Sequence, residues 1–125
     1  VYYIQYAHAR CVSVLRKAAE ITGDAHVSAG LAYLARLDEP ETLSLAVSLG
    51  RCPEVVANAA ERLEPHDVAN YLRELAAHFH SFYNAHKVLE GAPETMQARL
   101  ALVAATRQVI ASGLDLLGVS APDAM

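Results

Sequence analysis

Two sets of aromatic and cationic side chains in this sequence have the spacing of a helix face. The first consists of Tyr3, Arg10 and Lys17 at seven-residue intervals with Tyr6 beside them, and the second of His80, Tyr83 and Lys87. Rings next to cations suit single-stranded RNA, because unpaired bases stack on aromatic faces while lysine and arginine neutralise phosphates. An aromatic stripe at helical spacing is more often part of a core, however, and a row of cations is more often a solvated surface. The pattern by itself therefore leaves the function open.

Motifs for other kinds of chemistry are missing from the sequence. It contains no phosphate-binding loop and no G-x-G-x-x-G, H-E-x-x-H or G-x-S-x-G pattern, so we predict no catalytic residues. His78 and His80 point to nearly opposite sides of a helix and no histidine pair has i, i+4 spacing, so we predict no metal site. His8 shares an apolar face with Cys11, which favours a hydrogen-bonded histidine in the core. Neither Cys11 nor Cys52 has C-x-x-C spacing, which suits small buried side chains in a reducing cytoplasm.

The bulk composition is that of one compact domain without a general attraction to nucleic acid. Its 125 residues can bury a core without disulfides, and no apolar stretch reaches the roughly 20 residues that a membrane span requires. The net charge of −4 argues against sequence-blind binding, so any contact with RNA must be local. The N-terminus lacks the zones of a signal peptide, and the absence of an initiator methionine suggests a fragment of a longer protein.

Proline, glycine and apolar periodicity divide the chain into helices. Pro53 and Pro65 each begin a helical pattern, and Gly118 ends the last one. The predicted helices cover residues 1–21, 40–49, 53–63, 65–89 and 94–117. The pattern weakens over 24–37, which we interpret as a connector with at most a short helix over 28–36. The sequence has no alternating β-branched runs, so the predicted fold class is all-α, a helical bundle of about four to five helices.

Short motifs along the chain resemble those of one known family. The segments are YIQYAHAR at 3–10, LEPH at 63–66, YL at 71–72, FYNAH at 82–86, ARL at 98–100, TRQV at 106–109 and GLDLLGV at 113–119. The first is similar to the Y-x-Q-Y-A-H-(A/S)-R sequence that opens the DALR-type anticodon-binding domain of arginyl-tRNA synthetases. Because the matches keep their order and approximate spacing over nearly the whole length, the chain is identified as a member of this family.

The resemblance implies that this chain binds tRNA and that a separate domain performs the reaction. In this family a helical bundle of the class I synthetase type receives the anticodon arm, whereas an upstream domain joins arginine to its tRNA using ATP and, we expect, Mg²⁺. The chain has no counterpart of the HIGH-like and KMSK-like signatures of class I catalytic domains. We therefore expect residues 1–125 to be a single anticodon-binding domain, a C-terminal fragment that holds no cofactor and is not catalytic. The expected partners are the anticodon stem-loop of tRNA(Arg) and the catalytic domain of the same enzyme, in the cytoplasm, with neither DNA nor a membrane.

The resemblance also assigns residues to the tRNA contact. Tyr83 matches a family tyrosine that lies against the anticodon loop, and Met125 matches a terminal methionine that helps close the hydrophobic surface there. The predicted tRNA-binding residues are Tyr3, Tyr6, Arg10, Tyr83, Lys87 and Met125. The tail reads APDAM where the family often ends in APERM, so an arginine beside Met125 is missing. The final methionine suggests that the fragment ends where the enzyme ends.

Two other interpretations stay open on the sequence. One is the similar helical domain of another synthetase, such as a glycyl enzyme subunit, although the opening octet favours arginine. The other is a stand-alone helical protein-interaction module, in which the tyrosine stripes meet a partner protein. In that case tRNA would compete no better than any other polyanion.

Overall fold

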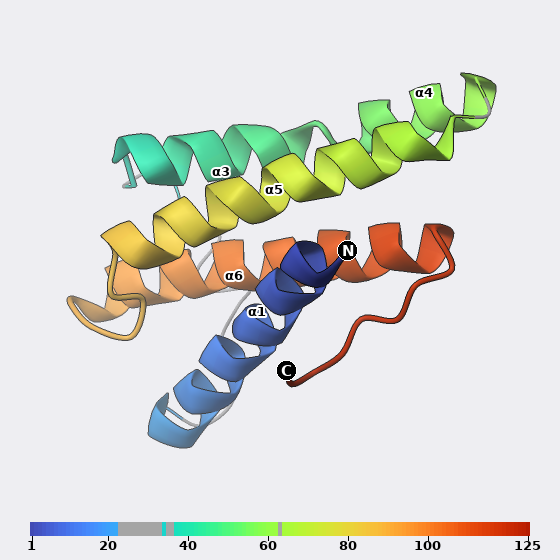
Figure 1. Cartoon of the computed structure of the whole chain (residues 1–125). Coiled ribbons are helices and arrows are strands. Elements are labelled where there is room, and N and C mark those ends of the chain that lie inside the picture. The colour runs from blue at the N-terminus through green and yellow to red at the C-terminus, as the bar shows by residue number, and fades with distance from the viewer. Residues whose placement is uncertain (23–33, 35–36, 63) are drawn as a thin grey trace.

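Figure 1 shows a bundle of helices, in which the computed structural model describes residues 1–22, 34, 37–62 and 64–125. The helices of the described residues are α1 (Tyr2–Thr22), α3 (Pro40–Gly50), α4 (Cys52–Arg62), α5 (Pro65–Ala85) and α6 (Pro93–Leu116). No strand occurs in these ranges, so the all-α prediction is confirmed for the described part of the chain. The short helix considered over 28–36 lies almost entirely outside the described residues. Within the same ranges, no helix combines the length and hydropathy needed to cross a bilayer.

Prolines begin three of the helices. The sequence predicts this for Pro40 and Pro65, whereas α6 begins at Pro93, one residue before its predicted start. Pro40, Pro65 and Pro93 are the first residues of α3, α5 and α6. Proline suits this position because the first N–H groups of a helix have no partner within it and the ring presets φ. Each of these helices also has an acidic residue in its first turn, where the helix dipole is positive. α4 begins at Cys52, one residue before the predicted start.

The end of α5 differs from the prediction. The helix ends at Ala85, whereas apolar periodicity had extended it to residue 89. His86 adopts an extended backbone with φ −132° and ψ 135°, while its N–H still donates to the carbonyl of Phe82. Nε2 of the His86 ring lies 3.4 Å from a carboxylate oxygen of Glu41 of α3. This contact comes from another helix, so the pattern within one helix could not reveal it.

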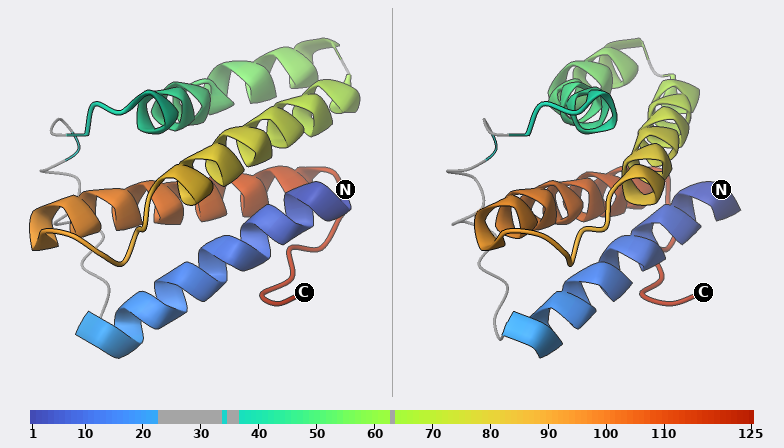
Figure 2. Two further views of the ribbon diagram at one scale, coloured as in Figure 1. Left: turned by 60° about the vertical axis from the view of Figure 1, so that its left-hand side comes forward. Right: turned by 90° about the vertical axis from the view of Figure 1, so that its left-hand side faces the viewer.

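α5 lies between the other helices of the bundle. α3 and α4 pack on one side of it, and α1 and α6 pack on the other (Figure 2). The apolar seam predicted along α5 is buried, and its members are Val68, Leu72, Leu75, Phe79 and Phe82. Burial of this apolar surface is the main term that favours folding. A Cβ atom on Gly113 of α6 would lie 2.7 Å from carbons of Leu72, so this glycine allows the two helices to approach closely.

Gly118 ends α6 and redirects the chain. Its φ of +72° lies in the left-handed region, which glycine adopts without steric penalty. The N–H of Gly118 donates to the carbonyl of Asp115, and the N–H of Val119 donates to that of Leu114. This pair of bonds is a Schellman motif. It turns residues 119–125 back toward α1 (Figure 1).

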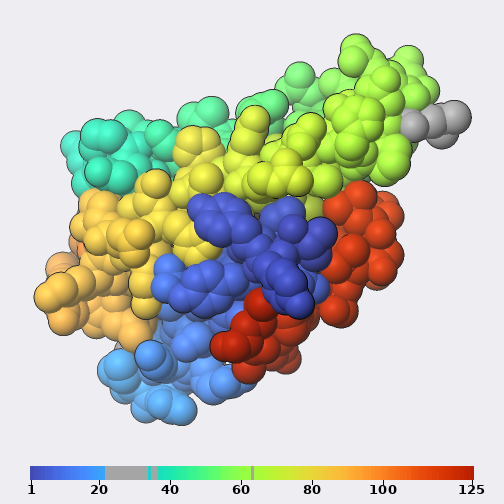
Figure 3. Space-filling view, viewed as in Figure 1, coloured from blue at the N-terminus to red at the C-terminus, as the bar shows by residue number. Residues whose placement is uncertain are grey.

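Two side chains of α1 hold the returning tail. Nε2 of Gln5 donates to the carbonyl of Ser120 at 2.9 Å, and Nδ1 of His8 donates to that of Pro122 at 2.9 Å. The side chains of the tail lie directly against α1 (Figure 3). His8 is buried, which confirms the prediction of a hydrogen-bonded core histidine. The sequence did not reveal that its partner is the tail.

The two cysteines are free thiols in different surroundings. Cys11 is fully buried, and burial raises the pKa of its thiol to about 12. It therefore stays protonated and behaves as a small apolar side chain, as predicted. Cys52 is only partly buried, so the expectation of a buried residue holds less well there.

Candidate nucleic-acid interface

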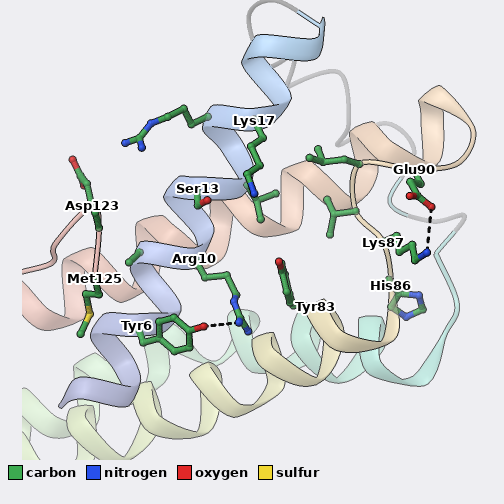
Figure 4. Close-up of a pocket in the computed structure, with 16 residues that line it drawn as sticks. Tyr6, Arg10, Ser13, Lys17, Tyr83, His86, Lys87, Glu90, Asp123 and Met125 are labelled. Atoms are coloured by element: carbon green, nitrogen blue, oxygen red, sulfur yellow. Dashed lines mark hydrogen bonds and ion pairs between the residues drawn. The ribbon is translucent and has the colours of Figure 1, made fainter.

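A groove with a volume of about 520 Å³ runs between α1, the end of α5 and the C-terminal tail (Figure 4). Among the residues that line it are Tyr6, Arg10, Tyr83, Lys87 and Met125. These are five of the six residues predicted to bind tRNA, and they come from three segments far apart in the sequence. The sixth, Tyr3, lies outside the groove lining and packs its ring on His80 at 4.9 Å between centroids. The structure thus brings five of the six predicted residues to one groove.

The groove is more positively charged than the chain as a whole. Its lining includes four cationic side chains, from Arg10, Arg16, Lys17 and Lys87, and two acidic ones, from Glu90 and Asp123. The chain carries a net charge of −4, so the cations are concentrated here. Lys87 lies 3.9 Å from Glu90, but both side chains are largely exposed and such a pair is weak. The local charge therefore favours a polyanion in the groove.

Arg10 is the most constrained of these cations. Its Nη2 donates to the hydroxyl of Tyr6 at 2.6 Å, and its Nη1 donates to Nδ1 of His80 at 3.0 Å. Its Cζ lies 4.2 Å from the centroid of the Tyr83 ring and 4.7 Å from that of the Tyr6 ring. Such cation–π contacts hold the guanidinium against both rings. Figure 4 shows Arg10 reaching from α1 to the side of Tyr83 on α5.

Tyr83 joins the groove to the core. Its ring lies 6.2 Å from the fully buried ring of Phe79, centroid to centroid, and is itself half-buried. The guanidinium of Arg10 covers one face of it. A base that enters the groove would therefore meet a layer made of Arg10 and the tyrosines instead of a bare ring. Bases stack on guanidinium planes as well as on aromatic side chains.

His80 is buried, although the sequence placed it on a stripe with Tyr83 and Lys87. It is only 9% exposed and packs against α1, where its ring lies 5.5 Å from the Tyr6 ring. Burial lowers the pKa of His80, and the charge of Arg10 lowers it further, so the ring is neutral at pH 7. Its pairing with Arg10 joins residues 70 positions apart, so helical spacing gave no signal for it.

The turn after α5 is fixed by a cluster of charged groups. The His86 ring lies 3.8 Å from Glu39, and Nη2 of Arg99 on α6 donates to the same Glu39 carboxylate at 3.0 Å. A backbone hydrogen bond lowers the pKa of the Glu39 carboxyl, and Arg99 and His86 add to this effect against the opposing effect of burial. Lys87 follows His86 directly and lies in a turn, not in the helix as predicted. The cluster thus holds the segment that carries Lys87 to the groove.

The sequence motifs missed Arg16 and the tail anchors. Arg16 lines the groove next to Lys17, and its only signal was this adjacency. Met125 is 61% exposed and lies at the groove because Gln5 and His8 hold the tail on α1. Both anchors lie inside the opening motif of the resemblance, where their types were visible but their partner was not.

The sequence was also compared with models of known protein families. The family model described as the DALR anticodon binding domain matches residues 4–125. The chain belongs to the DALR anticodon-binding domain family, as its motifs predict.

Individual relatives make the assignment more specific. Over its whole length, the chain is 55% identical to an arginine–tRNA ligase of Thioalkalivibrio sulfidiphilus and 51% identical to one of Acinetobacter baumannii. It spans 21% of each of these relatives, so it corresponds to about a fifth of their length. The relatives favour neither a glycyl enzyme nor a stand-alone interaction module.

Solved structures show the same fold. An arginyl-tRNA synthetase of Thermus thermophilus matches 98% of this chain with a TM-score of 0.81 and 39% identity, over 21% of its own length. A structure described as a putative arginyl-tRNA synthetase of Campylobacter jejuni matches 99% of the chain, and 26% of its own length, with a TM-score of 0.82 and 31% identity. The predicted helical bundle of the synthetase type is therefore confirmed.

Proposed function

We propose that this chain is the anticodon-binding domain of an arginine–tRNA ligase and that its groove receives the anticodon loop of tRNA(Arg). One observation supports this most strongly. In a member of an anticodon-binding family, three remote segments bring tyrosines, cations and Met125 to one groove. The same groove is positively charged in a chain that is negative overall. A binding site restricted to one part of the surface is what such a charge distribution favours.

The groove offers the two kinds of contact that an anticodon loop requires. Anticodon bases are unpaired, so they can stack on the layer of Arg10, Tyr6 and Tyr83 without disruption of a duplex. Each such stack contributes about 1 to 3 kcal/mol to the binding free energy. Lys17 and Lys87 would neutralise phosphates, which fixes the position of the RNA but does not read its sequence. Met125 would add an apolar contact at the open side of the groove.

For the whole enzyme we propose the joining of arginine to tRNA(Arg) with the use of ATP, in the cytoplasm. ATP and Mg²⁺ would be held by a separate catalytic domain, to which this domain delivers the acceptor end of the tRNA. The arginine–tRNA ligases that resemble the chain are about five times as long, which supports this division. On this proposal, residues 1–125 supply recognition of the RNA and no catalytic group.

Binding to paired transcripts tests the proposal. The affinity of the chain is measured for a tRNA(Arg) transcript and for one whose anticodon has been replaced, at one moderate salt concentration. We expect clear preference for the native anticodon, because the N–H groups of Arg10 that bind neither Tyr6 nor His80 can donate to a base edge, whereas stacking alone tolerates any base. Equal affinity for the two transcripts would refute recognition of the anticodon, since phosphate contacts do not distinguish them.

A further inference from the structure

His80 contacts three of the residues predicted to bind RNA, although it does not itself line the groove. Its Nδ1 lies 3.0 Å from Nη1 of Arg10, and its ring packs against the rings of Tyr3 and Tyr6. We infer that His80 is a positioning residue, which fixes Arg10 for RNA binding without touching the RNA. This inference rests on the function proposed above.

The hydrogen bond determines which tautomer His80 adopts. An arginine guanidinium only donates, so Nδ1 of His80 must be the acceptor and the proton of the neutral ring must be on Nε2. Nε2 is buried and has no hydrogen-bond partner among the described residues. A buried N–H without a partner is unfavourable, so this tautomer is retained against a cost. The compensating interaction in the structure is the one with Arg10.

Positioning of Arg10 before RNA arrives should strengthen binding. An arginine side chain has many rotamers, and ordering them on association reduces the affinity. Tyr6 constrains Arg10 from the exposed side of α1, where water competes for the same hydrogen bond. His80 constrains it from the buried side, where water does not compete. Each constraint uses one N–H of the guanidinium, so other N–H groups stay available for a phosphate or a base.

Two substitutions test separately the two contributions of His80, its hydrogen-bond acceptor Nδ1 and its aromatic ring. His80→Phe keeps an aromatic ring against Tyr3 and Tyr6 but removes the acceptor. His80→Asn loses the ring but places an amide oxygen close to the position of Nδ1, where it can accept from Arg10. Affinity for the anticodon stem-loop is measured for both variants, after circular dichroism has confirmed that each is folded. We expect His80→Phe to bind about ten-fold more weakly than wild type and His80→Asn to recover most of that loss.

A double substitution tests whether His80 acts through Arg10. Arg10→Gln removes the guanidinium that His80 positions. In this background His80→Phe should weaken binding little further, because the two residues act as one unit. A merely structural role of His80 would instead give losses that add.

The pH dependence of binding gives a further test of the role of His80. Among the described residues, the charged and titratable groups that face His80 are the guanidinium of Arg10 and the phenols of Tyr3 and Tyr6. Burial lowers the pKa of His80 from its usual value of 6.5, so the ring gains a proton only in acidic solution and then can no longer accept. Wild-type affinity should therefore fall as the pH drops from about 7.5 to about 5, and the step should be smaller in His80→Asn.

The outcomes distinguish this inference from the proposed function. If wild type binds the stem-loop and His80→Phe binds it equally well, the role of His80 is wrong and the proposed function stands. If wild type binds the native and the replaced anticodon equally well, both the role of His80 and the proposed function are wrong. Weak binding by His80→Phe, rescue by His80→Asn and non-additivity with Arg10→Gln would together establish the role.

Discussion

Two tyrosines of α5, twelve residues apart, lie in different surroundings. Tyr71 is 4% exposed, and its hydroxyl donates to the carbonyl of Ser48 at 2.7 Å. Burial raises the pKa of Tyr71 to about 12. Tyr83 lies at the edge of the groove with its ring beneath the guanidinium of Arg10. The two side chains thus differ in their partner: a backbone carbonyl holds Tyr71 in the core, whereas the Arg10 guanidinium lies over Tyr83 at the groove.

The hollows on the two sides of α5 also differ, in the charge of the side chains that line them. A second hollow of about 250 Å³ lies beside α4 and is lined by two cationic and two acidic side chains, from Arg51, Arg62, Asp67 and Glu74. Arg51 and Glu74 pair with each other at 3.4 Å. The groove beside α1 has four cations and two acids. A hollow whose charges balance offers little to a polyanion, so of these two hollows the groove beside α1 is the one whose charge favours a polyanion.

The largest expected effect comes from the core that supports both tyrosines. Phe79 is fully buried and contacts the Tyr83 ring, so Phe79→Ala should lower the free energy of unfolding by about 3 to 5 kcal/mol. Denaturant unfolding measures this. Ser81→Ala, at an exposed position of the same helix, serves as the control and should change stability by less than about 0.5 kcal/mol. A loss below about 1 kcal/mol for Phe79→Ala would mean that the core is packed differently.

Removal of one hydroxyl distinguishes the two tyrosines. Tyr71→Phe leaves the buried carbonyl of Ser48 without its partner and should lower the free energy of unfolding by about 1 to 3 kcal/mol. Tyr83→Phe removes a hydroxyl for which no buried partner is seen among the described residues, so its stability should change little. Thermal unfolding of both variants, with RNA affinity measured beside it, tests this. Equal destabilisation by Tyr71→Phe and Tyr83→Phe would show that the two hydroxyls do not differ in their contribution to stability.

Loss of the Tyr83 ring should affect binding more than folding. Tyr83→Ala should reduce the free energy of anticodon-loop binding by about 1 to 3 kcal/mol, because a stacking surface and a support of Arg10 are both lost. Tyr2→Ala is the matched control, since Tyr2 is 79% exposed and lies outside the groove. Unfolding as severe as that of Phe79→Ala would reassign Tyr83 to the core.

The smallest effect concerns a single phosphate contact. Lys17→Gln should reduce the slope of log affinity against log salt concentration by about 0.7, the value for one phosphate of single-stranded RNA. Arg62→Gln, in the charge-balanced hollow, should leave the slope unchanged. A series of titrations at different salt concentrations gives both slopes. A larger change for Arg62 than for Lys17 would place the RNA on the other side of α5.

Local signals predicted most of the fold. Pro65 and Gly118 mark helix ends through their own backbone preferences, and these hold in any tertiary context. The candidate tRNA-binding residues were predicted from the aromatic and cationic stripes and from motif resemblance, and the structure places five of these six residues around one groove. The early end of α5 at His86 and the pairing of Arg10 with His80 depend on contacts between helices. No spacing within one helix encodes such contacts, so the sequence could not predict them.

Amide chemical shifts measured during titration with the anticodon stem-loop of tRNA(Arg) test the central claim most directly, because each residue reports separately. We expect the largest changes at Tyr6, Arg10, Tyr83 and Met125, around the groove, with little change at Arg62 beside α4. Changes centred on Arg62, with the groove unaffected, would contradict the assignment of the groove to the anticodon loop.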